Sequence, residues 1–572
     1  MKWLFAEHNP REVALLASSA GISVCAARVL CSRGYSDPAA ARRYLSPSSG
    51  DLHDPFLLAD MHRASERLAQ AIQNRESILL YGDYDVDGTS ALVVLKTVIG
   101  LAGGEATCFV PHRLRDGYGM KSEVVADAAG RGVRLIVSVD TGIRANDVVR
   151  HAADLGIDVI VTDHHLPDES LPPGFAVINP NRPDCAYPEK NLCGAGVALK
   201  LADALLRTLG WESARREKLL DSLLKMVAIA TVADVVPLVG ENRVIVKRGL
   251  EGLRRVTNPG LRALLDISEI PAGSAPSVRD IAFGVAPRIN AAGRMASASD
   301  VVELFTTTDA ARAQAIAAQL HELNADRRQT QDDISKSIVE QCIGQPVTDD
   351  DAALVFAGEG WHRGVVGIVA SKVVERYHRP VFVLGIENGV AHGSGRSIRQ
   401  FHLLEALESM PELFTKFGGH RQAAGLTIAS ERIEEFRSRF REYAAALLTP
   451  DDFEAELDID AEMEIGEIND GVVGELLNLA PFGMGNPPPL FVSRNVELAA
   501  SPDIKNEKHA FVRLCAPGRP LLVKAWNAAD RMRDLRPGDR MDVALQFEDD
   551  AYSAKRGYAP WQTVLKDFRV HS

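Results

Sequence analysis

The sequence predicts an α/β protein, in which a parallel-sheet domain is joined by a long helix to a second α/β domain, with a C-terminal β-barrel. Three observations support this fold class. Short β-branched runs alternate with helical stretches over about 46–250. Residues 301–343 contain neither Gly nor Pro. Five short strand-like runs follow one another within 486–572. The length of 572 residues suits about three or four domains.

Composition excludes several classes of protein. Hydrophobic residues make up 46% and charged residues 25%, as in ordinary globular proteins, so wholesale disorder is unsupported. The seven cysteines are scattered and form no C-x-x-C pair, which disfavours a disulfide framework and a thiolate zinc site. No apolar run approaches the roughly 20 residues that cross a bilayer, and the first residues lack a signal-peptide core. We therefore expect a reduced, cytoplasmic, soluble protein without a membrane partner.

The net charge is −13, from 64 basic and 77 acidic residues. A uniformly acidic surface repels nucleic acid. The total does not exclude nucleic-acid binding, because binding depends on where the positive charges cluster.

The first 45 residues contain two short helical patterns and no recognisable chemistry. In the α/β segment that follows, three β-branched runs each end on acidic residues. The runs are 77–81, 135–139 and 158–162, and they lead to Asp83, Asp85 and Asp87, to Asp140, and to Asp163. Ligands gather at the carboxyl ends of parallel strands. We therefore expect these carboxylates to converge.

Asp83, Asp85 and Asp87 occupy alternate positions after the first run. In an extended chain their side chains share one side, with neighbours about 7 Å apart. Three like charges need a cation, and oxygen ligands with imidazole nearby favour Mg²⁺ or Mn²⁺. An EF-hand loop begins with a similar pattern. That loop needs Glu at its twelfth position, where this chain has Val94, so the EF-hand is excluded.

Two further segments, 163–165 and 231–238, supply His164, His165 and Asp234. A single Asp at a strand end is more often a cap or turn former than a ligand, and His164 alone is more often structural. Together with the acidic triplet, these residues suit two ions about 3.5–4 Å apart, a spacing that activates water and holds a phosphoryl group.

The stretch 301–343 predicts a helix reaching on the order of 60 Å, with a break near 306–309 where Asp309 caps a new start. A second α/β pattern follows at about 350–448, with strand candidates at 353–356 and 380–384.

Residues 451–470 carry ten carboxylates and no Lys or Arg, which indicates a solvated acidic face or a connecting strand. After the turn-rich segment 482–489 the balance reverses, and residues 486–572 hold 14 basic against 11 acidic residues. Strand-like runs in this region predict the barrel; they are 490–492, 510–514, 521–526, 541–547 and 561–568.

Four motifs resemble those of the DHH phosphoesterase superfamily. They are D-Y-D-V-D-G at 83–88, D-T-G at 140–142, D-H-H at 163–165 and A-D-V-V-P-L at 233–238. Three further segments resemble the RecJ family within it, namely 284–294, 361–370 and 417–420. That family comprises bacterial single-strand-specific 5′-to-3′ DNA exonucleases. The resemblance spans about residues 45–570.

The resemblance implies a set of catalytic residues and metal ligands, with Mn²⁺ or Mg²⁺ as the two ions. The implied catalytic residues are Asp85, Asp87, Asp140, His164, His165 and Asp234. The implied metal ligands are the same residues with Asp83 in place of His165. Asp85 and Asp87 each serve one ion, and Asp140 bridges both. Other branches of the superfamily have a His ligand at the position of Tyr81. In this chain the resemblance implies Asp83 as the replacement ligand. His165 contacts substrate phosphate or solvent, and Asp163 orients the histidines from behind.

The second α/β domain resembles the DHHA1 domain, whose G-G-H signature falls on Gly418, Gly419 and His420. Its amides would approach a phosphate, and His420 would donate to it. Further substrate-binding candidates are Arg113, Arg115, Tyr118, Arg288, His362, Arg396 and Ser397. Arg288 is the candidate for the terminal 5′ phosphate. For each arginine a surface salt bridge is an equally good interpretation.

The C-terminal module resembles an OB domain, which holds single strands through a basic groove and stacking aromatics. The candidates are Lys505, Lys508, His509, Arg513, Lys524 and Trp526. For Trp526 a place in the core is the more common role.

The expected domains are an N-terminal helical segment, a DHH domain, a connecting helix, a DHHA1-like domain and an OB-like domain. Their ranges are 1–45, 46–300, 301–345, 346–448 and 449–572. The resemblance implies a monomeric exonuclease that releases 5′ mononucleotides by two-metal-ion hydrolysis. It implies work in DNA recombination and repair, on single-stranded DNA, beside a helicase and a single-strand-binding protein.

Two alternatives stay open. A DHH phosphodiesterase for short oligonucleotides or cyclic dinucleotides usually lacks the C-terminal module and the connecting helix. A non-catalytic single-strand-binding relative has generally lost the metal carboxylates. An inorganic pyrophosphatase is a distant third, because its chain is far shorter.

Overall fold

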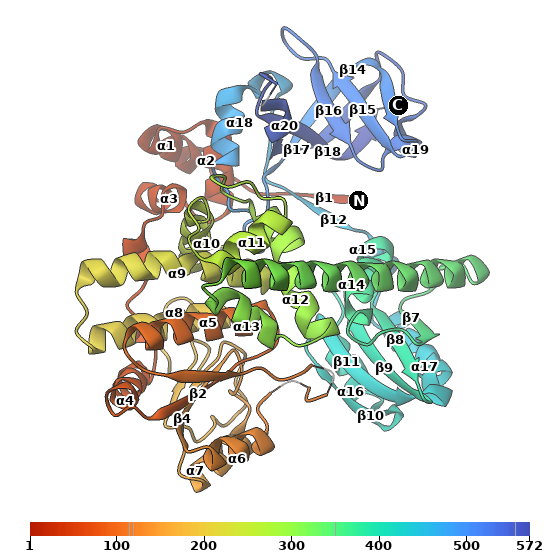
Figure 1. The fold of residues 1–572 in the computed structure, drawn as a ribbon. Coiled ribbons are helices and arrows are strands. Elements are labelled where there is room, and N and C mark those ends of the chain that lie inside the picture. The colour runs from red at the N-terminus through yellow and green to blue at the C-terminus, as the bar shows by residue number, and fades with distance from the viewer. Residues whose placement is uncertain (114, 118, 349, 555, 572) are drawn as a thin grey trace.

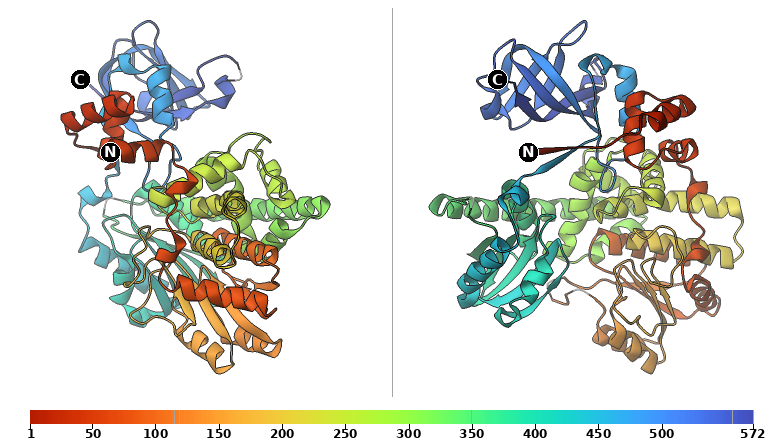
Figure 2. Two further views of the ribbon diagram at one scale, coloured as in Figure 1. Left: turned by 90° about the vertical axis from the view of Figure 1, so that its left-hand side faces the viewer. Right: turned by 180° about the vertical axis from the view of Figure 1, so that it is seen from behind.

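The structure is a computed structural model that describes residues 1–113, 115–117, 119–348, 350–554 and 556–571, without the side chains of 551 and 552. Figure 1 shows an α/β domain and a helical layer above it, a second α/β domain beside them, and a β-barrel at the top. Figure 2 shows the same arrangement from the side and from behind. The predicted fold class is confirmed.

The first sheet is parallel and has the strand order β3-β2-β4-β5-β6. Its strands are β2 (Ser77–Tyr81), β3 (Ala106–Phe109), β4 (Val133–Val139), β5 (Asp158–Thr162) and β6 (Ala176–Ile178). The three β-branched runs are therefore the neighbouring strands β2, β4 and β5. Because all strands run the same way, their acidic continuations meet at one edge of the sheet.

Helices cover both faces of this sheet, as a buried parallel sheet requires. One face packs against α4 (Met61–Gln73), α5 (Val86–Leu101) and α8 (Gly194–Thr208). The other face packs against α6 (Ser122–Gly130) and α7 (Asn146–Asp154). Helix α5 is apolar around most of its circumference because α8 and α9 (Ser213–Ala233) also cover it.

A helical layer connects the two α/β domains. It contains α9, α10 (Gly240–Gly252), α11 (Pro259–Ile267), a π-helical turn (Asp280–Val285), α12 (Ala286–Met295), α13 (Ser299–Thr306) and α14 (Ala310–Gly344). The predicted break is confirmed, since Asp309 accepts hydrogen bonds from the N–H groups of Ala311 and Arg312 at 2.8 and 3.3 Å. Helix α14 has 35 residues, or about 50 Å, and reaches the second sheet.

The second sheet has the order β10-β11-β9-β8-β7. Strands β7 and β8 are parallel, and the other pairs are antiparallel. Its elements are β7 (Leu354–Glu359), α15 (Val366–Tyr377), β8 (Val381–Glu387), β9 (Val390–Arg396), α16 (Leu403–Glu408), β10 (Phe414–Gly419), β11 (Ala423–Ala429) and α17 (Ile433–Ala445). Both predicted strands are present, each starting one residue later than expected.

The C-terminal sheet closes into a barrel because β14 pairs with both β15 and β17. All five predicted runs form strands. The elements are β13 (Ala461–Glu462), α18 (Asp470–Leu477), β14 (Leu490–Lys505), β15 (His509–Leu514), β16 (Leu521–Ala525), α19 (Ala529–Met532), β17 (Arg540–Asp549), α20 (Ala551–Ala554) and β18 (Trp561–Val570).

The first 45 residues are mainly helical as expected, but they form three helices rather than two and begin with a short strand. The segment forms β1 (Lys2–Phe5), α1 (Pro10–Ala20), α2 (Val24–Ser32) and α3 (Pro38–Leu45). Strand β1 pairs in parallel with β12 (Glu456–Ile459), so part of the acidic segment is the expected connecting strand. A strand of four residues was missed because the strand it pairs with, β12, is some 450 residues away in the chain. Among the helices of the described residues, none on its own combines the length and the apolar composition of a membrane span.

Candidate metal centre and anion pocket

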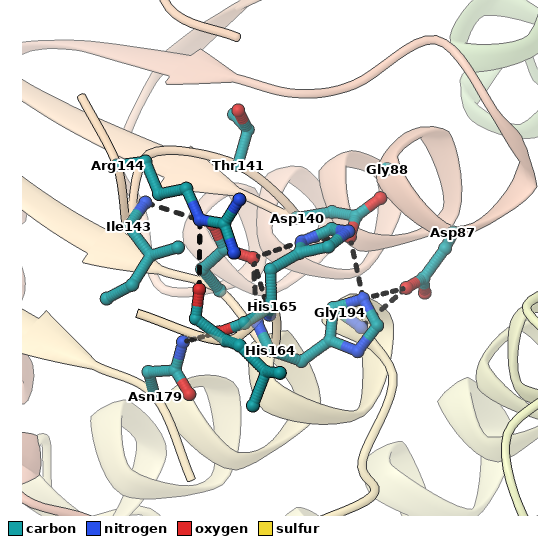
Figure 3. Close-up of polar contacts among 12 residues, drawn as sticks. Asp87, Gly88, Asp140, Thr141, Ile143, Arg144, His164, His165, Asn179 and Gly194 are labelled. Carbon is teal, nitrogen blue, oxygen red and sulfur yellow. Dashed lines mark hydrogen bonds and ion pairs between the residues drawn. The ribbon is translucent and has the colours of Figure 1, made fainter. Parts of the chain in front are cut away.

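The acidic and histidine segments converge at the carboxyl edge of the first sheet. Figure 3 shows Asp87, Asp140, His164 and His165 of these segments. Their ligand atoms form three groups, each within 4.8 Å: Asp83, Asp85 and Asp140; Asp87, His164 and Asp234; Asp140, His164 and His165. Because Asp140 and His164 each belong to two groups, the three groups form one cluster. We call this set of seven residues the metal cluster.

The expected extended arrangement of Asp83, Asp85 and Asp87 is wrong. The Asp85 carboxylate caps α5 by accepting a hydrogen bond from the Gly88 N–H at 3.0 Å, so helix begins at Val86. Asp87 therefore lies in the first helical turn. The turn divides the triplet: Asp83 and Asp85 face Asp140, whereas Asp87 faces His164.

The N-terminus of α8 holds the Asp87 carboxylate. Its oxygens accept hydrogen bonds from the N–H groups of Gly194 and Ala195 at 2.5 and 2.8 Å (Figure 3). A Cβ at position 194 would lie 2.6 Å from the Asp140 Cβ, so only glycine allows this close approach. The helix N-terminus offsets part of the charge of the buried carboxylate.

Asp140 follows β4 in the left-handed backbone region, with φ of 58°. Asp adopts this region more readily than most residues. Its Oδ1 lies 3.2 Å from His164 Nε2, and the residue is buried. Burial and the charges of Asp87, Asp85, Asp83 and Asp234 raise the pKa of Asp140 well above its ordinary value.

Asp163 is fully buried and holds the two histidines from behind. Its Oδ1 accepts hydrogen bonds from the backbone N–H groups of His164 and His165 and contacts His165 Nδ1 at 2.7 Å. Its Oδ2 accepts from the Ile143 N–H at 3.0 Å. Burial alone would lower the pKa of His165, but the hydrogen bond and charge of Asp163 outweigh it and raise that pKa. Burial lowers the pKa of His164, which favours its neutral, ligating form.

The metal cluster fits divalent cations. Asp83 Oδ1, His164 Nε2 and Asp234 Oδ2 are buried and have no hydrogen-bond partner among the described residues. Buried polar atoms in native proteins are nearly always satisfied. Carboxylate oxygens with one or two imidazoles are the donor set that Mg²⁺ and Mn²⁺ take.

Proton uptake is the alternative to cation binding at this cluster. Burial and the neighbouring Asp85 raise the pKa of Asp83 to about 8. Burial, Asp87 and Asp85 raise the pKa of Asp234 to about 9. Without cations, the folded protein therefore keeps protons that the unfolded chain loses near pH 3.9.

We expect the stabilisation by Mn²⁺ to grow with pH. Because the pKa values of Asp83 and Asp234 are raised on folding, the metal-free protein loses stability as pH rises from about 4 to about 9. Bound cations displace those protons and remove the penalty. Melting temperatures with EDTA or Mn²⁺ should therefore differ more at about pH 8.5 than at about pH 6.5. An equal or smaller difference at the higher pH would contradict this account.

A second site, the arginine pocket, lies beside the metal cluster. Its volume is about 260 Å³, and its described lining includes Arg113, Arg294, Arg363 and Arg396 with Ser371 and Ser394, and no carboxylate. Arg113 stacks on Tyr84, which precedes the metal-cluster residue Asp85, with 5.0 Å from its guanidinium carbon to the ring centre. Burial, with the charges of Arg113 and Arg327, lowers the pKa of Arg294 to about 10. Such a pocket suits a phosphate.

The sequence predicted two residues of this pocket, Arg113 and Arg396. It did not assign Arg294, Arg363 or Ser394, although Arg294 and Arg363 lie in the segments 284–294 and 361–370 that carried the resemblance. These three come from α12, the loop before α15, and β9, so only the tertiary fold brings them together.

Arg288 and Ser397 lie outside the arginine pocket as the structure defines it. The buried Arg288 guanidinium donates to the Gly284 and Ile267 carbonyls at 2.5 and 3.1 Å. The Ser397 hydroxyl donates to the Phe401 carbonyl at 3.0 Å. Both side chains thus support local structure, and a phosphate contact of Arg288 stays a prediction.

Two other candidates lie at different places. Arg115 is exposed and pairs with Asp116 at 2.8 Å, as the salt-bridge interpretation expects. His362 Nδ1 accepts a hydrogen bond from the N–H of Gly364, which lines the arginine pocket, at 3.2 Å. Tyr118 lies outside the described residues.

The G-G-H signature faces the metal cluster. Gly418 and Gly419 end β10, and Gly419 has φ of 152°. His420 and His165 line one cavity of about 850 Å³, which also reaches Arg144 and Asn146 at the start of α7. The second domain therefore closes over the histidine side of the cluster.

In the barrel, the core interpretation of Trp526 is wrong. Its side chain is 47% exposed, and its ring packs edge-on against His509 and Phe511 with centroid distances of 4.9 and 6.2 Å. Lys508 and Arg513 are also exposed. Lys505 pairs with Asp503 at 2.8 Å, and Lys524 with Asp550 at 3.4 Å.

Three segments match known families: 77–231 the DHH family, N-terminal domain; 350–446 the DHHA1 domain; and 459–560 the RecJ OB domain. The chain is 37% identical over 576 residues to the single-stranded-DNA-specific exonuclease RecJ of Bacillus subtilis, covering all of this chain and 71% of that protein. It is similar to crystal structures of RecJ from Thermus thermophilus. With the Mn²⁺ complex the TM-score is 0.85 at 30% identity, covering 100% of this chain and 80% of that chain. With the Mg²⁺ complex it is 0.79 at 28% identity, covering 100% and 79%.

Proposed function

The chain belongs to the RecJ family of the DHH superfamily, and we propose that it is a single-stranded-DNA-specific exonuclease that removes 5′ mononucleotides in the 5′-to-3′ direction. The observation that carries this proposal is the metal cluster with the arginine pocket beside it. Mn²⁺ or Mg²⁺ is the cofactor.

The metal cluster would hold two ions. Asp85 and Asp87 belong to different ligand groups and would serve different ions, and Asp140 and His164 lie where the groups meet. Such an ion pair activates water and neutralises charge on the phosphoryl group when bound. Asp83 and Asp234 would add one ligand to each ion, because they belong to different ligand groups. Each has a buried carboxylate oxygen that lacks a hydrogen-bond partner among the described residues.

His165 would bind the scissile phosphate. Its Nδ1 is held by Asp163, and its raised pKa favours the protonated ring. The ring therefore offers its other N–H to a phosphate oxygen in the cavity that it shares with His420. His420 would donate from the opposite domain and orient the same phosphate.

The arginine pocket would set the polarity. A terminal 5′ phosphate carries more negative charge than an internal phosphodiester. No nucleotide precedes it, so a small pocket can accommodate it. Several guanidinium groups in one small pocket therefore favour a 5′ end over an internal position.

The barrel would bind the part of the substrate strand that lies at a distance from the cleaved bond. Trp526 is exposed beside His509, and bases of any sequence stack on such rings. Exposed Lys508 and Arg513 would contact the backbone. As a family member the chain would act in the cytoplasm, as a monomer, in recombination and repair beside a helicase and a single-strand-binding protein.

We expect digestion to start at the 5′ end of single strands. A 5′-phosphorylated oligonucleotide labelled at its 5′ end should release labelled mononucleotide at once, whereas the same strand labelled at its 3′ end should shorten stepwise. A blunt duplex should stay intact. Gel analysis with Mn²⁺ measures all three. Stepwise shortening of the 5′-labelled strand would refute the polarity, and a preference for dinucleotides over long strands would favour the short-oligonucleotide phosphodiesterase.

A further inference from the structure

An apolar surface borders the metal cluster on the side of Asp234. A cavity of about 680 Å³ lies there, within the size range of small-molecule pockets, roughly 300–1,000 Å³. Three chain segments build it, and we call six of their apolar residues the apolar shelf: Val235, Val236, Leu238, Phe283, Phe482 and Met484. Phe283, Val235 and Met484 are 71%, 66% and 57% exposed.

Hydrogen bonds and close packing hold the segments of the apolar shelf together. The Leu238 N–H donates to the Met484 carbonyl at 2.7 Å, which ties the loop before the barrel to the loop after α9. A Cβ at Gly483 would lie 2.7 Å from Leu238 Cδ1, so the two segments pack closely. The buried Asn486 side chain fixes the same loop by donating to the Leu479 and Pro481 carbonyls.

Two uncommon backbone conformations present the exposed side chains. Val235 has φ of 58°, and a β-branched residue in this region is strained. Phe283 lies in the π-helical turn, a rare conformation that is frequent at functional sites. Both features cost stability, and both place an apolar side chain in solvent at the same cavity.

The apolar shelf lies between the metal cluster and the barrel. Val235 directly follows Asp234, and residues 482–484 lie just before β14, the strand that closes the barrel. Figure 1 shows the same order in space, with the helical layer between the first sheet and the barrel. A strand that runs from the metal cluster to the barrel passes this surface.

We propose that the apolar shelf binds unpaired nucleobases of the substrate strand on the 3′ side of the cleaved bond; this rests on the proposed function. Base faces stack on apolar and aromatic side chains whatever the sequence. Arg279, which lines the same cavity, supplies a cation for the accompanying backbone phosphate. Bases of a duplex are stacked and paired, so they cannot reach this surface. The apolar shelf thus contributes to single-strand specificity.

The test replaces Phe283 by Ala. The side chain is mostly exposed, so the melting temperature should change little. KM for a long single strand should rise about tenfold, and this rise should exceed any rise for a 5′-phosphorylated dinucleotide, which has only one base on the 3′ side of the cleaved bond. Phe283→Trp should restore KM. The matched control is Ile343→Ala, which removes an equally exposed apolar side chain at the end of α14.

Abasic substrates locate the contact. Strands are compared that each carry one abasic position, placed at successive nucleotides 3′ to the first bond. The strand whose abasic position meets Phe283 should bind the wild-type protein about tenfold more weakly than the intact strand. At that position Phe283→Ala should cause no further loss, because the two changes remove the same contact. Val235→Gly is a second variant that relieves the strained backbone. It should raise KM in the same direction without lowering the melting temperature.

Three results would overturn or separate the proposals. If the wild-type protein digests single strands and Phe283→Ala leaves KM unchanged, the apolar shelf proposal fails and the proposed function stands. If the wild-type protein digests no strand, the proposed function fails, and the apolar shelf proposal fails with it because it rests on that function. If Phe283→Ala dissociates an oligomer in sedimentation and leaves KM unchanged, the surface joins two copies of this chain, and base binding is refuted.

Discussion

Replacing Asp140 by Asn is expected to lower the rate of single-strand digestion by at least about a thousandfold. Asp140 lies where the ligand groups of the two proposed ions meet. The amide keeps the shape of the side chain but removes its charge, so both ions lose an anionic ligand at once. Quenched-flow or gel-based initial rates with saturating Mn²⁺ measure the loss.

Asn is the suitable replacement because it adopts the left-handed backbone of position 140, where φ is 58°, without added strain. In the metal-free state at neutral pH the variant should melt at a higher temperature than the wild type. The raised pKa of Asp140 costs folding stability at any pH above its value in the unfolded chain, and Asn has no carboxyl that carries this cost. If Asp140→Asn melts at a higher temperature and has lost activity, the loss comes from the chemical role of Asp140 and not from misfolding. The control is Asp154→Asn, an exposed carboxylate in the same domain. A variant that keeps more than about a tenth of the wild-type rate would contradict the account.

The second large effect is expected at the arginine pocket. Replacing Arg396 by Gln should lower kcat/KM for 5′-phosphorylated strands by about a hundredfold, because a buried ionic contact with the terminal phosphate is lost. Its Nη1 donates to Ser394 Oγ at 3.1 Å and to the Gly395 carbonyl at 2.8 Å, so the guanidinium is held in place. Strands with a 5′ hydroxyl should be affected far less, since they never make the contact.

The readout is the ratio of kcat/KM values for phosphorylated and unphosphorylated strands. Arg131→Gln, which removes an exposed arginine paired with Asp127, should leave this ratio unchanged. If Arg396→Gln lowers both values by the same factor, the arginine pocket does not read the terminal phosphate, and polarity has another origin.

Local patterns were sufficient to predict the parts of the site that follow strands. The runs at 77–81 and 158–162 are β2 and β5 as expected. Because parallel strands share one carboxyl edge, Asp140 and Asp163 meet the first acidic segment without further information. The cap at Asp309 was also predictable, because a capping side chain acts on its own helix.

Features that depend on distant contacts were not predictable in this way. Asp87 turns away from Asp83 because the chain enters α5 there, where α8 supplies its amide partners. Arg294 and Arg363 meet only after the second domain docks. The strain at Val235 belongs to a backbone angle, which residue type does not reveal. These positions are where packing overrides local preference.

The central claim is that the metal cluster holds two divalent cations. The most direct test is anomalous diffraction from crystals soaked in Mn²⁺. We expect two peaks about 3.5–4 Å apart, with Asp140 in contact with both, Asp85 and Asp87 on different ions, and His164 and Asp234 among the ligands. A single peak, or ions held outside this cluster, would contradict the account.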